Sequence, residues 1–141
     1  MSETVILSPG GPHSPEYTCQ VANAAAEAIR VLNHATLNHA DEALAYPADV
    51  DAVIEALATM HARLPQLYGQ LAEWLRGQLA AGRLQIGYGP YRGDPAAAVG
   101  EIAGSLQLAA AGGDAAHLAL GQARQITATI SAAGRESGGA S

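Results

Sequence analysis

Five histidines and one cysteine are the residues of this 141-residue chain best suited to metal binding or nucleophilic chemistry. His34 and His39 are five residues apart, which places them roughly 140° apart around a helix. Paired zinc ligands on one helix are typically closer in sequence and share one face. His34 and Asp41 do share a face, but two ligands make no structural site, and Cys19 is far along the same segment. We therefore expect surface histidines, no metal and no cofactor.

The sequence also shows no combination of residues typical of catalysis. Cys19 has no base beside it in sequence, the serines lie mainly in the terminal segments, and the carboxylates are scattered without apparent pairing. A single cysteine also excludes a disulfide within one chain. We expect that the protein is not an enzyme and has no catalytic residues.

The segment at residues 88–93 is the first candidate for a binding site, because it brings tyrosine and arginine together on a glycine-rich loop. Both residue types are common anchors at protein interfaces. The alternative is an ordinary connector whose tyrosine rings rest on the helices. The glycines do not match a phosphate-binding loop, which needs a preceding strand and a following lysine. The predicted partner-binding residues, including two on the preceding helix, are Tyr88, Tyr91, Arg92, Tyr68 and Leu75.

Three long amphipathic segments predict the helices that must position these residues. The first begins at Ser14, a good N-cap, with Pro15 in the first helical position. Pro47 disfavours helical backbone in the residue before it, so we expect this helix to fray or end near Ala45. Its apolar residues recur at alternating gaps of four and three: Tyr17, Val21, Ala24, Ala28, Val31 and Ala35.

The second helix is predicted to begin near Pro47 or Asp49. Pro65 lies in its middle, where a proline removes a backbone hydrogen bond and costs about 3 kcal/mol. The apolar periodicity continues across Pro65, so we expect a kink rather than a break, and Gly82 provides a left-handed stop. Ala58 lies off the predicted core row. That row, with two leucines beside it, is Val53, Leu57, Met60, Leu64, Leu67, Leu71 and Trp74, flanked by Leu75 and Leu79.

The third helix is predicted to begin with Asp94 as N-cap and Pro95 in the first position. Gly112 and Gly113 interrupt it, and each costs up to ~1 kcal/mol relative to alanine. The apolar register survives them, which favours one continuous helix. Its predicted row is Val99, Ile102, Leu106, Ala109, Gly113, Ala116, Leu120, Ala123, Thr127 and Ile130.

These segments predict an all-α fold, a bundle of about three long helices with the second kinked at Pro65 and with disordered termini. We expect a flexible N-terminal arm over residues 1–13, a helical bundle over 14–133 and a Gly/Ser-rich disordered tail over 134–141. Alanine supplies much of the 49% hydrophobic fraction. The core must therefore come from close contact between helices rather than from bulky side chains.

The charge and hydropathy patterns disfavour two classes of partner, nucleic acids and membranes. The net charge is −6, and the seven basic residues, all arginine, are scattered, which disfavours direct nucleic-acid binding. The first residues lack the basic segment of a signal peptide, and no apolar stretch reaches the ~18 residues of a membrane span. We expect a cytoplasmic protein that does not bind membranes.

Residues 40–106 resemble small uncharacterised helical proteins of Streptomyces and other actinomycetes. The most specific segments of the resemblance are YPADV at 46–50 and LPQL at 64–67. The resemblance implies a small cytoplasmic accessory protein of the kind that lies near integrated plasmids, phage-like elements and regulatory genes. It provides no catalytic residues to transfer.

The second helix carries more apolar surface than one bundle core needs, since a second row lies beside the main one. With charged residues at 14%, little polar surface remains to cover it. We therefore predict a non-enzymatic protein-interaction module that binds a protein partner or itself as a homodimer, as an accessory or regulatory protein of a mobile genetic element. The alternative is a nucleic-acid-linked transcriptional regulator that acts directly or through a partner. This second row consists of Ile54, His61, Tyr68 and Leu75.

Overall fold

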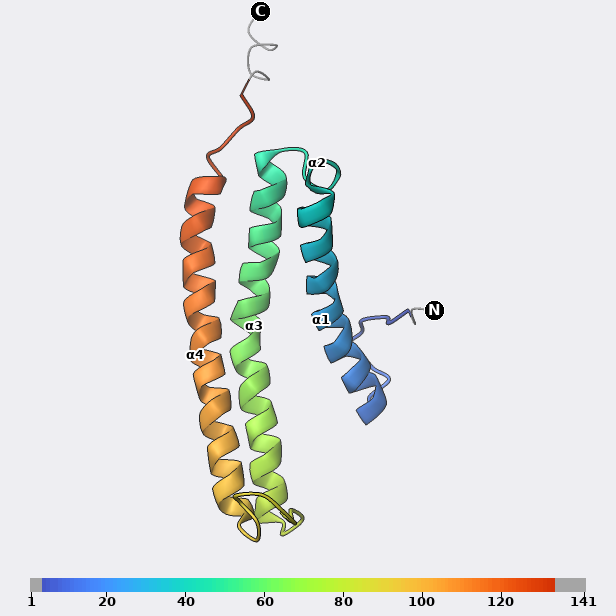
Figure 1. Ribbon diagram of the computed structural model, residues 1–141, viewed down its shortest axis with the longest axis vertical. Helices are drawn as coiled ribbons and strands as arrows, with labels where there is room; N and C mark the ends of the chain where they lie inside the picture. Colours follow the sequence, from blue (N-terminus) through green and yellow to red (C-terminus); the bar gives the residue numbers. More distant parts are fainter. Residues whose placement is uncertain (1–3, 134–141) are drawn as a thin grey trace, which may run out of the picture. The chain divides into compact units, whose positions relative to one another are not determined.

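The computed structural model describes residues 4–133, and this part of the chain is mostly helical and contains no strand (Figure 1). The prediction of an all-α fold is confirmed. The predicted tail at 134–141 and the first three residues of the predicted arm lie outside the described residues. The helices in the described part are α1 (Pro15–Asn38), α2 (Ala40–Ala43), α3 (Pro47–Ala80) and α4 (Pro95–Thr127).

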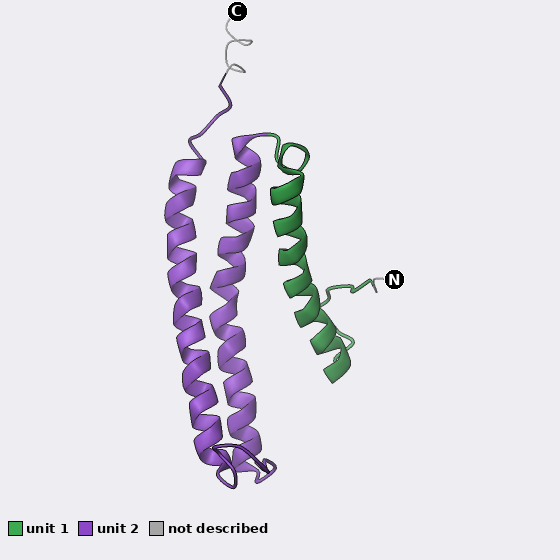
Figure 2. Cartoon of the chain, in the orientation of Figure 1, with its two compact units in different colours: residues 1–45 green, residues 46–141 purple. Residues whose placement is uncertain are grey.

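The chain divides into two compact units, Met1–Ala45 and Tyr46–Ser141 (Figure 2). The first unit contains α1 and α2. The second contains α3 and α4, which pack against each other along their lengths. The sequence pattern places residues 14–133 in one bundle, whereas the structure shows compact packing within each unit.

The predicted helix starts are confirmed by their capping hydrogen bonds. The Ser14 hydroxyl accepts a hydrogen bond from the Tyr17 N–H at 3.1 Å, and Pro15 follows in the first turn. At the start of α4, the Asp94 carboxylate accepts one from the Ala97 N–H at 3.1 Å. These side chains satisfy backbone donors that have no partner inside the helix.

The predicted end of the first helix near Ala45 is wrong, because α1 ends at Asn38. His39 leaves the helical region with φ −133°, and the four-residue α2 follows it. Pro47 restricts only the residue directly before it, so it does not set this end. The last turn of α1 instead contains asparagine and histidine, which are weaker helix formers. The Asn38 amide contacts the His34 ring at 3.1 Å within that turn.

Helix α3 continues through Pro65 without a break, and α4 continues through Gly112 and Gly113, as predicted, while the kink at Pro65 stays a prediction. Pro65 has no N–H, so the His61 carbonyl loses its usual helical donor. A Cβ atom on Gly113 would lie 3.2 Å from that carbonyl oxygen and 3.4 Å from Pro65 Cδ. The lack of a side chain at Gly113 therefore allows α4 to approach the proline turn of α3.

Helices α3 and α4 are antiparallel, and small residues form the centre of their contact. Early α3 meets late α4, since the Ala58 carbonyl lies 2.9 Å from Nδ1 of His117. Later in α3, Pro65 meets Gly113. The residues buried in this unit are Ala58 and Ala72 of α3, and Ala98, Val99, Ala103 and Gly113 of α4. Small side chains let two helices approach closely, as the alanine-rich composition predicts.

The predicted core row of α3 is wrong in its later half. Leu67 and Leu71 are 47% exposed and Trp74 is 63% exposed, whereas Ala58, predicted to lie outside the core, is 7% exposed. The row that faces α4 lies one residue further along the chain. We call it the contact row of α3, and it comprises Ile54, Ala58, His61, Pro65, Tyr68, Ala72 and Leu75.

The predicted row of α4 is correct except at Ile102, Ala109 and Ile130, which are exposed. Val99 and Gly113 are buried, and Leu106 and Leu120 are half-buried, as expected for residues that face α3. At two of the exposed positions the contact lies one residue later than predicted, so Ile102 is 43% exposed whereas Ala103 is 8% exposed, and Ala109 is exposed whereas Ala110 is half-buried. The contact row of α4 comprises Val99, Ala103, Leu106, Ala110, Gly113, His117, Leu120, Arg124 and Thr127.

A non-helical turn connects α3 to α4, as the glycines predict. Gly82, just beyond α3, has φ +70°, the left-handed conformation expected of a helix stop. The Gly93 N–H donates a hydrogen bond to the Ile86 carbonyl at 3.0 Å and closes the turn. Leu84 and Ile86 are half-buried beside it.

Candidate protein-interaction surface

An apolar surface runs along one side of the α3–α4 pair, beside the contact rows. In both helices it is formed by exposed or half-buried residues that directly precede residues in contact with the other helix; Ala98, which precedes Val99, is buried and is not part of it. We call it the uncharged flank. It comprises Val50, Val53, Leu57, Met60, Leu64, Leu67, Leu71 and Trp74 of α3, and Ile102, Ser105, Ala109, Gly112, Ala116, Ala119, Ala123 and Ile126 of α4.

The antiparallel arrangement places these two sets of residues on the same side. An antiparallel helix pair has an approximate twofold axis perpendicular to the plane of the helices, so equivalent positions flank the contact on the same side. The residues that follow the contact positions give independent support. Gly69 and Arg76 of α3 line one shallow groove together with Gln107 of α4, on the opposite side of the pair.

No residue of the uncharged flank is ionisable. Its side chains provide neither an acid, a base nor a nucleophile beyond the Ser105 hydroxyl, so its chemistry is that of apolar contact. The opposite side, which we call the polar flank, contains Glu55, Glu73, Arg76 and Asp114. The Arg76 guanidinium lies 2.6 Å from the Glu73 carboxylate there. Contiguous exposed apolar surface of this kind usually marks an interaction site.

A polar cluster joins the end of α4 to the start of α3. The Thr127 hydroxyl donates a hydrogen bond to Asp51 at 2.6 Å, and the Arg124 guanidinium donates at 3.2 Å. Arg124 also lies 3.5 Å from the Glu55 carboxylate. The hydrogen bond from Thr127, followed by that from Arg124, lowers the pKa of Asp51 below its ordinary value. These groups are paired with each other, so the cluster has a structural role in the helix pair.

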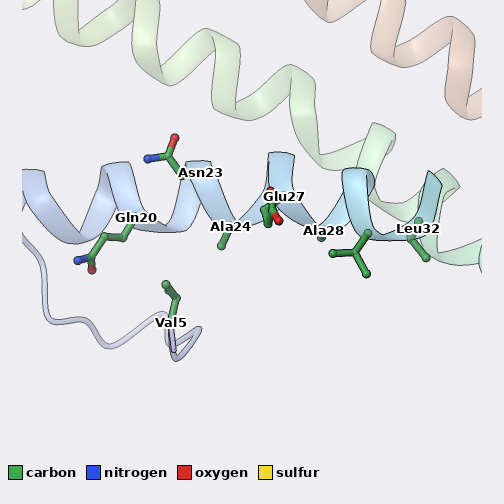
Figure 3. A pocket seen from close by; sticks show the side chains of 8 residues that line it. Val5, Gln20, Asn23, Ala24, Glu27, Ala28 and Leu32 are labelled. Carbon is green, nitrogen blue, oxygen red and sulfur yellow. The ribbon is translucent and has the colours of Figure 1, made fainter. Parts of the chain in front are cut away.

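The N-terminal arm is attached to α1 through one tyrosine. The Tyr17 hydroxyl donates a hydrogen bond to the Ile6 carbonyl at 2.6 Å and accepts one from the Ser8 N–H at 3.1 Å. Val5 of the arm and α1 residues of the segment 20–32 line an open groove of about 710 Å³ (Figure 3). Glu27 in this groove is paired with Arg30, whose hydrogen bond lowers the pKa of the Glu27 carboxyl. The groove contains no obvious catalytic pair.

The histidines lie in two different settings. The ring centroids of His34 and His39 are 5.5 Å apart. In a continuous helix the two side chains would point in different directions, but α1 ends at Asn38, between them. His61 and His117 lie in the contact rows, where Nδ1 of His117 contacts the Ala58 carbonyl and Nδ1 of His61 is buried without a hydrogen-bond partner. Within residues 4–133, no group of three His, Cys, Asp or Glu side chains is arranged to hold a metal ion.

The structure distributes the predicted partner-binding residues over two places. Tyr88 is 88% exposed and Arg92 is exposed in the turn, while Tyr91 is half-buried there. Tyr68 and Leu75 are half-buried in the contact row of α3. Tyr68 and Leu75 therefore contribute to packing against α4, and the exposed turn residues lie at the end of the helix pair.

The uncharged flank was missed by sequence reasoning because it was predicted to be the core. Leu67, Leu71 and Trp74 belong to the strongest apolar stripe of α3. Hydrophobicity alone therefore places them in the core of the helix pair. One signal was available in the sequence: the neighbouring row contains Ala58 and Ala72 at positions where a close helix contact requires small residues.

Comparison with protein-family models, curated proteins and solved structures finds no match for this chain. The resemblance to actinomycete proteins therefore stays a prediction. No helix within residues 4–133 combines the length and apolar character needed to cross a membrane. The function must accordingly be argued from the chain's own surfaces.

Proposed function

We propose that this protein is a non-enzymatic helical protein-interaction module whose binding surface is the uncharged flank. One observation carries the proposal: a surface that extends along both long helices contains several exposed large apolar side chains and no ionisable group. Burying such a surface is favourable by about 25 cal/mol for each Å² removed from water. A role as an accessory protein of a mobile genetic element stays a prediction.

Three of the six arginines in the described part of the chain are already paired with carboxylates, which weakens the nucleic-acid alternative. Arg30, Arg76 and Arg124 are each paired with a carboxylate of the same chain. A nucleic-acid interface needs several basic side chains that share one face and are free to meet phosphates. The uncharged flank offers no basic side chain.

The test compares two leucine-to-glutamate variants of the full chain. Leu67→Glu introduces a charge in the uncharged flank, and Leu118→Glu introduces the same charge in the polar flank, where the side chain is 67% exposed. Each tagged protein is exposed to lysate of the organism that encodes it, and captured proteins are identified by mass spectrometry. Sedimentation of the purified protein shows whether it binds a second copy of itself. We expect wild type and Leu118→Glu to hold a stoichiometric partner, either a second copy or another protein, and Leu67→Glu to lose it.

Two outcomes would overturn the proposal. One is a wild-type chain that remains monomeric and holds no partner. The other is a partner that both variants hold equally well, which would place the binding surface elsewhere. Circular dichroism of both variants shows whether the helices are retained, so that a loss of binding can be separated from a loss of fold.

A further inference from the structure

The uncharged flank carries large side chains on α3 and small ones on α4, and we call these two sides the ridge and the trough. The α3 side is formed by large side chains, whereas the α4 side between its two ends is formed by alanine, glycine and serine. The contacts of Ala58 with His117 and of Pro65 with Gly113 fix which residues of the two helices lie at equal height. At equal height, large residues of α3 lie beside small residues of α4: Leu57 with Ala119, Met60 with Ala116, Leu64 with Gly112, Leu67 with Ala109 and Leu71 with Ser105.

We propose that the occupant of the uncharged flank is a second copy of this chain, related by a twofold axis parallel to the helices. This inference rests on the proposed function and names its partner. Such an axis places α3 of each copy over α4 of the other, at the same height. The ridge of each copy then enters the trough of its partner, so the surface is complementary to itself, as a twofold interface requires.

The alternative twofold axis runs across the helices and places α3 over α3. The ridge would then meet a ridge, and the small residues of both α4 helices would face each other across a gap. Voids of this kind forfeit contacts that close packing provides. Both arrangements make each helix antiparallel to its two immediate neighbours, as in an antiparallel four-helix bundle, so the fit of large against small side chains decides between them.

The size of the surface fits a stable dimer. The flank is about 40 Å long at 1.5 Å per residue and about 20 Å wide across two helices. Its area is therefore roughly 800 Å² per copy, which is the usual contribution of one partner to a stable interface. The ionisable residues of the polar flank stay in water on the outer sides of the dimer, so its formation buries no charge from either flank.

The first experiment measures the mass of the full chain by sedimentation velocity at micromolar concentration. We expect a dimer for wild type and for Leu118→Glu, and a monomer for Leu67→Glu. Trp74, the only tryptophan of the chain, lies on the uncharged flank and is 63% exposed in one copy. Its fluorescence should shift to longer wavelength on dilution of wild type, and it should stay at longer wavelength at all concentrations of Leu67→Glu.

The second experiment determines which helix lies over which. In a Cys19→Ser background, chains with Leu67→Cys are mixed with chains with Ala109→Cys and oxidised. We expect a disulfide-linked heterodimer, because these positions face each other between copies. A Leu118→Cys chain in place of Ala109→Cys serves as the matched control and should give no cross-link. Cross-linking of Leu67→Cys with itself, without the mixed product, would place α3 over α3 and would overturn the arrangement.

The remaining outcomes separate this inference from the proposed function. A monomeric wild type that captures a different protein through the uncharged flank would overturn the second copy and support the proposed function. A monomer that captures nothing would overturn both. A monomer whose Trp74 fluoresces as a buried indole would also overturn both, because another segment of the same chain would then cover the flank.

Discussion

The two flanks of the α3–α4 pair differ in chemistry although the same two helices build them. The polar flank carries both signs of charge and includes the ion pair between Arg76 and Glu73. The uncharged flank carries exposed Leu67, Leu71 and Trp74. Between them, the contact rows join through alanine and glycine. The comparison shows that Leu67, Leu71 and Trp74 face outward from the contact, while the buried residues between the two helices are no larger than valine.

The largest expected effect comes from adding bulk to the contact between the helices. Gly113→Leu places a side chain where even a Cβ would meet the His61 carbonyl at 3.2 Å. Overpacking of this kind typically lowers the free energy of unfolding by about 1–3 kcal/mol. Gly104→Leu, on the polar flank of the same helix, has nothing within 4 Å of its Cβ and should gain up to ~1 kcal/mol from helix propensity.

Urea unfolding followed by circular dichroism measures this difference. Both variants introduce leucine in place of glycine in α4, so helix propensity cancels and the packing effect remains. Equal stability of the two variants would mean that α3 and α4 do not approach closely at Gly113.

A second pair of variants compares the contact row with the uncharged flank at neighbouring turns. In the Leu67→Glu background, which we expect to be monomeric, Leu75→Ala should lower the free energy of unfolding by about 2 kcal/mol. Leu71→Ala should lower it by less than ~1 kcal/mol, because that side chain is already 47% exposed. If Leu71→Ala lowered the free energy of unfolding more than Leu75→Ala, the core would lie in the row that the sequence pattern predicts. The same unfolding experiment measures both variants.

The Asp51 cluster predicts a dependence of stability on pH. The folded pKa of Asp51 is lowered by Thr127 and Arg124, so its stabilising effect is present above the ordinary pKa and is lost as the pH falls through the lowered one. Below about pH 4, the melting temperature of wild type should therefore fall more steeply than that of Asp51→Asn.

Glu27→Gln is the control for this pH experiment, since Glu27 also has a lowered pKa but lies in the first compact unit. It should leave the pH dependence of the α3–α4 pair unchanged. Melting curves that are parallel for wild type and Asp51→Asn down to pH 2 would show that the Asp51 cluster contributes nothing to stability.

The smallest expected effect concerns the N-terminal arm. Tyr17→Phe removes the hydrogen bonds to Ile6 and Ser8, each of which normally contributes about 0.5–1.5 kcal/mol or less at an exposed site. We expect faster proteolysis within residues 4–13 and an unchanged melting temperature for α3 and α4. Ala25→Ser on the exposed side of α1 serves as the control and should leave the cleavage rate unchanged. An arm cleaved at the same rate in wild type and Tyr17→Phe would contradict this role for Tyr17.

The sequence by itself determined the helical character of the chain and most helix boundaries. Ser14 and Asp94 cap their helices through local hydrogen bonds that need no distant partner, and Gly82 ends α3 through its own backbone conformation. The continuity of α4 across Gly112 and Gly113 also follows from the uninterrupted register. These features depend on neighbours in sequence, so local physical chemistry predicts them.

Only the tertiary structure decided which face of each helix meets the other. Two adjacent apolar rows compete on α3, and hydrophobicity favours the row of Leu67 and Trp74 over that of Ala58 and Ala72. The smaller residues form the contact because Gly113 of α4 lies opposite Pro65, and the close approach there requires small side chains on both helices. That requirement belongs to the pair of surfaces, so the pattern of one helix cannot reveal it.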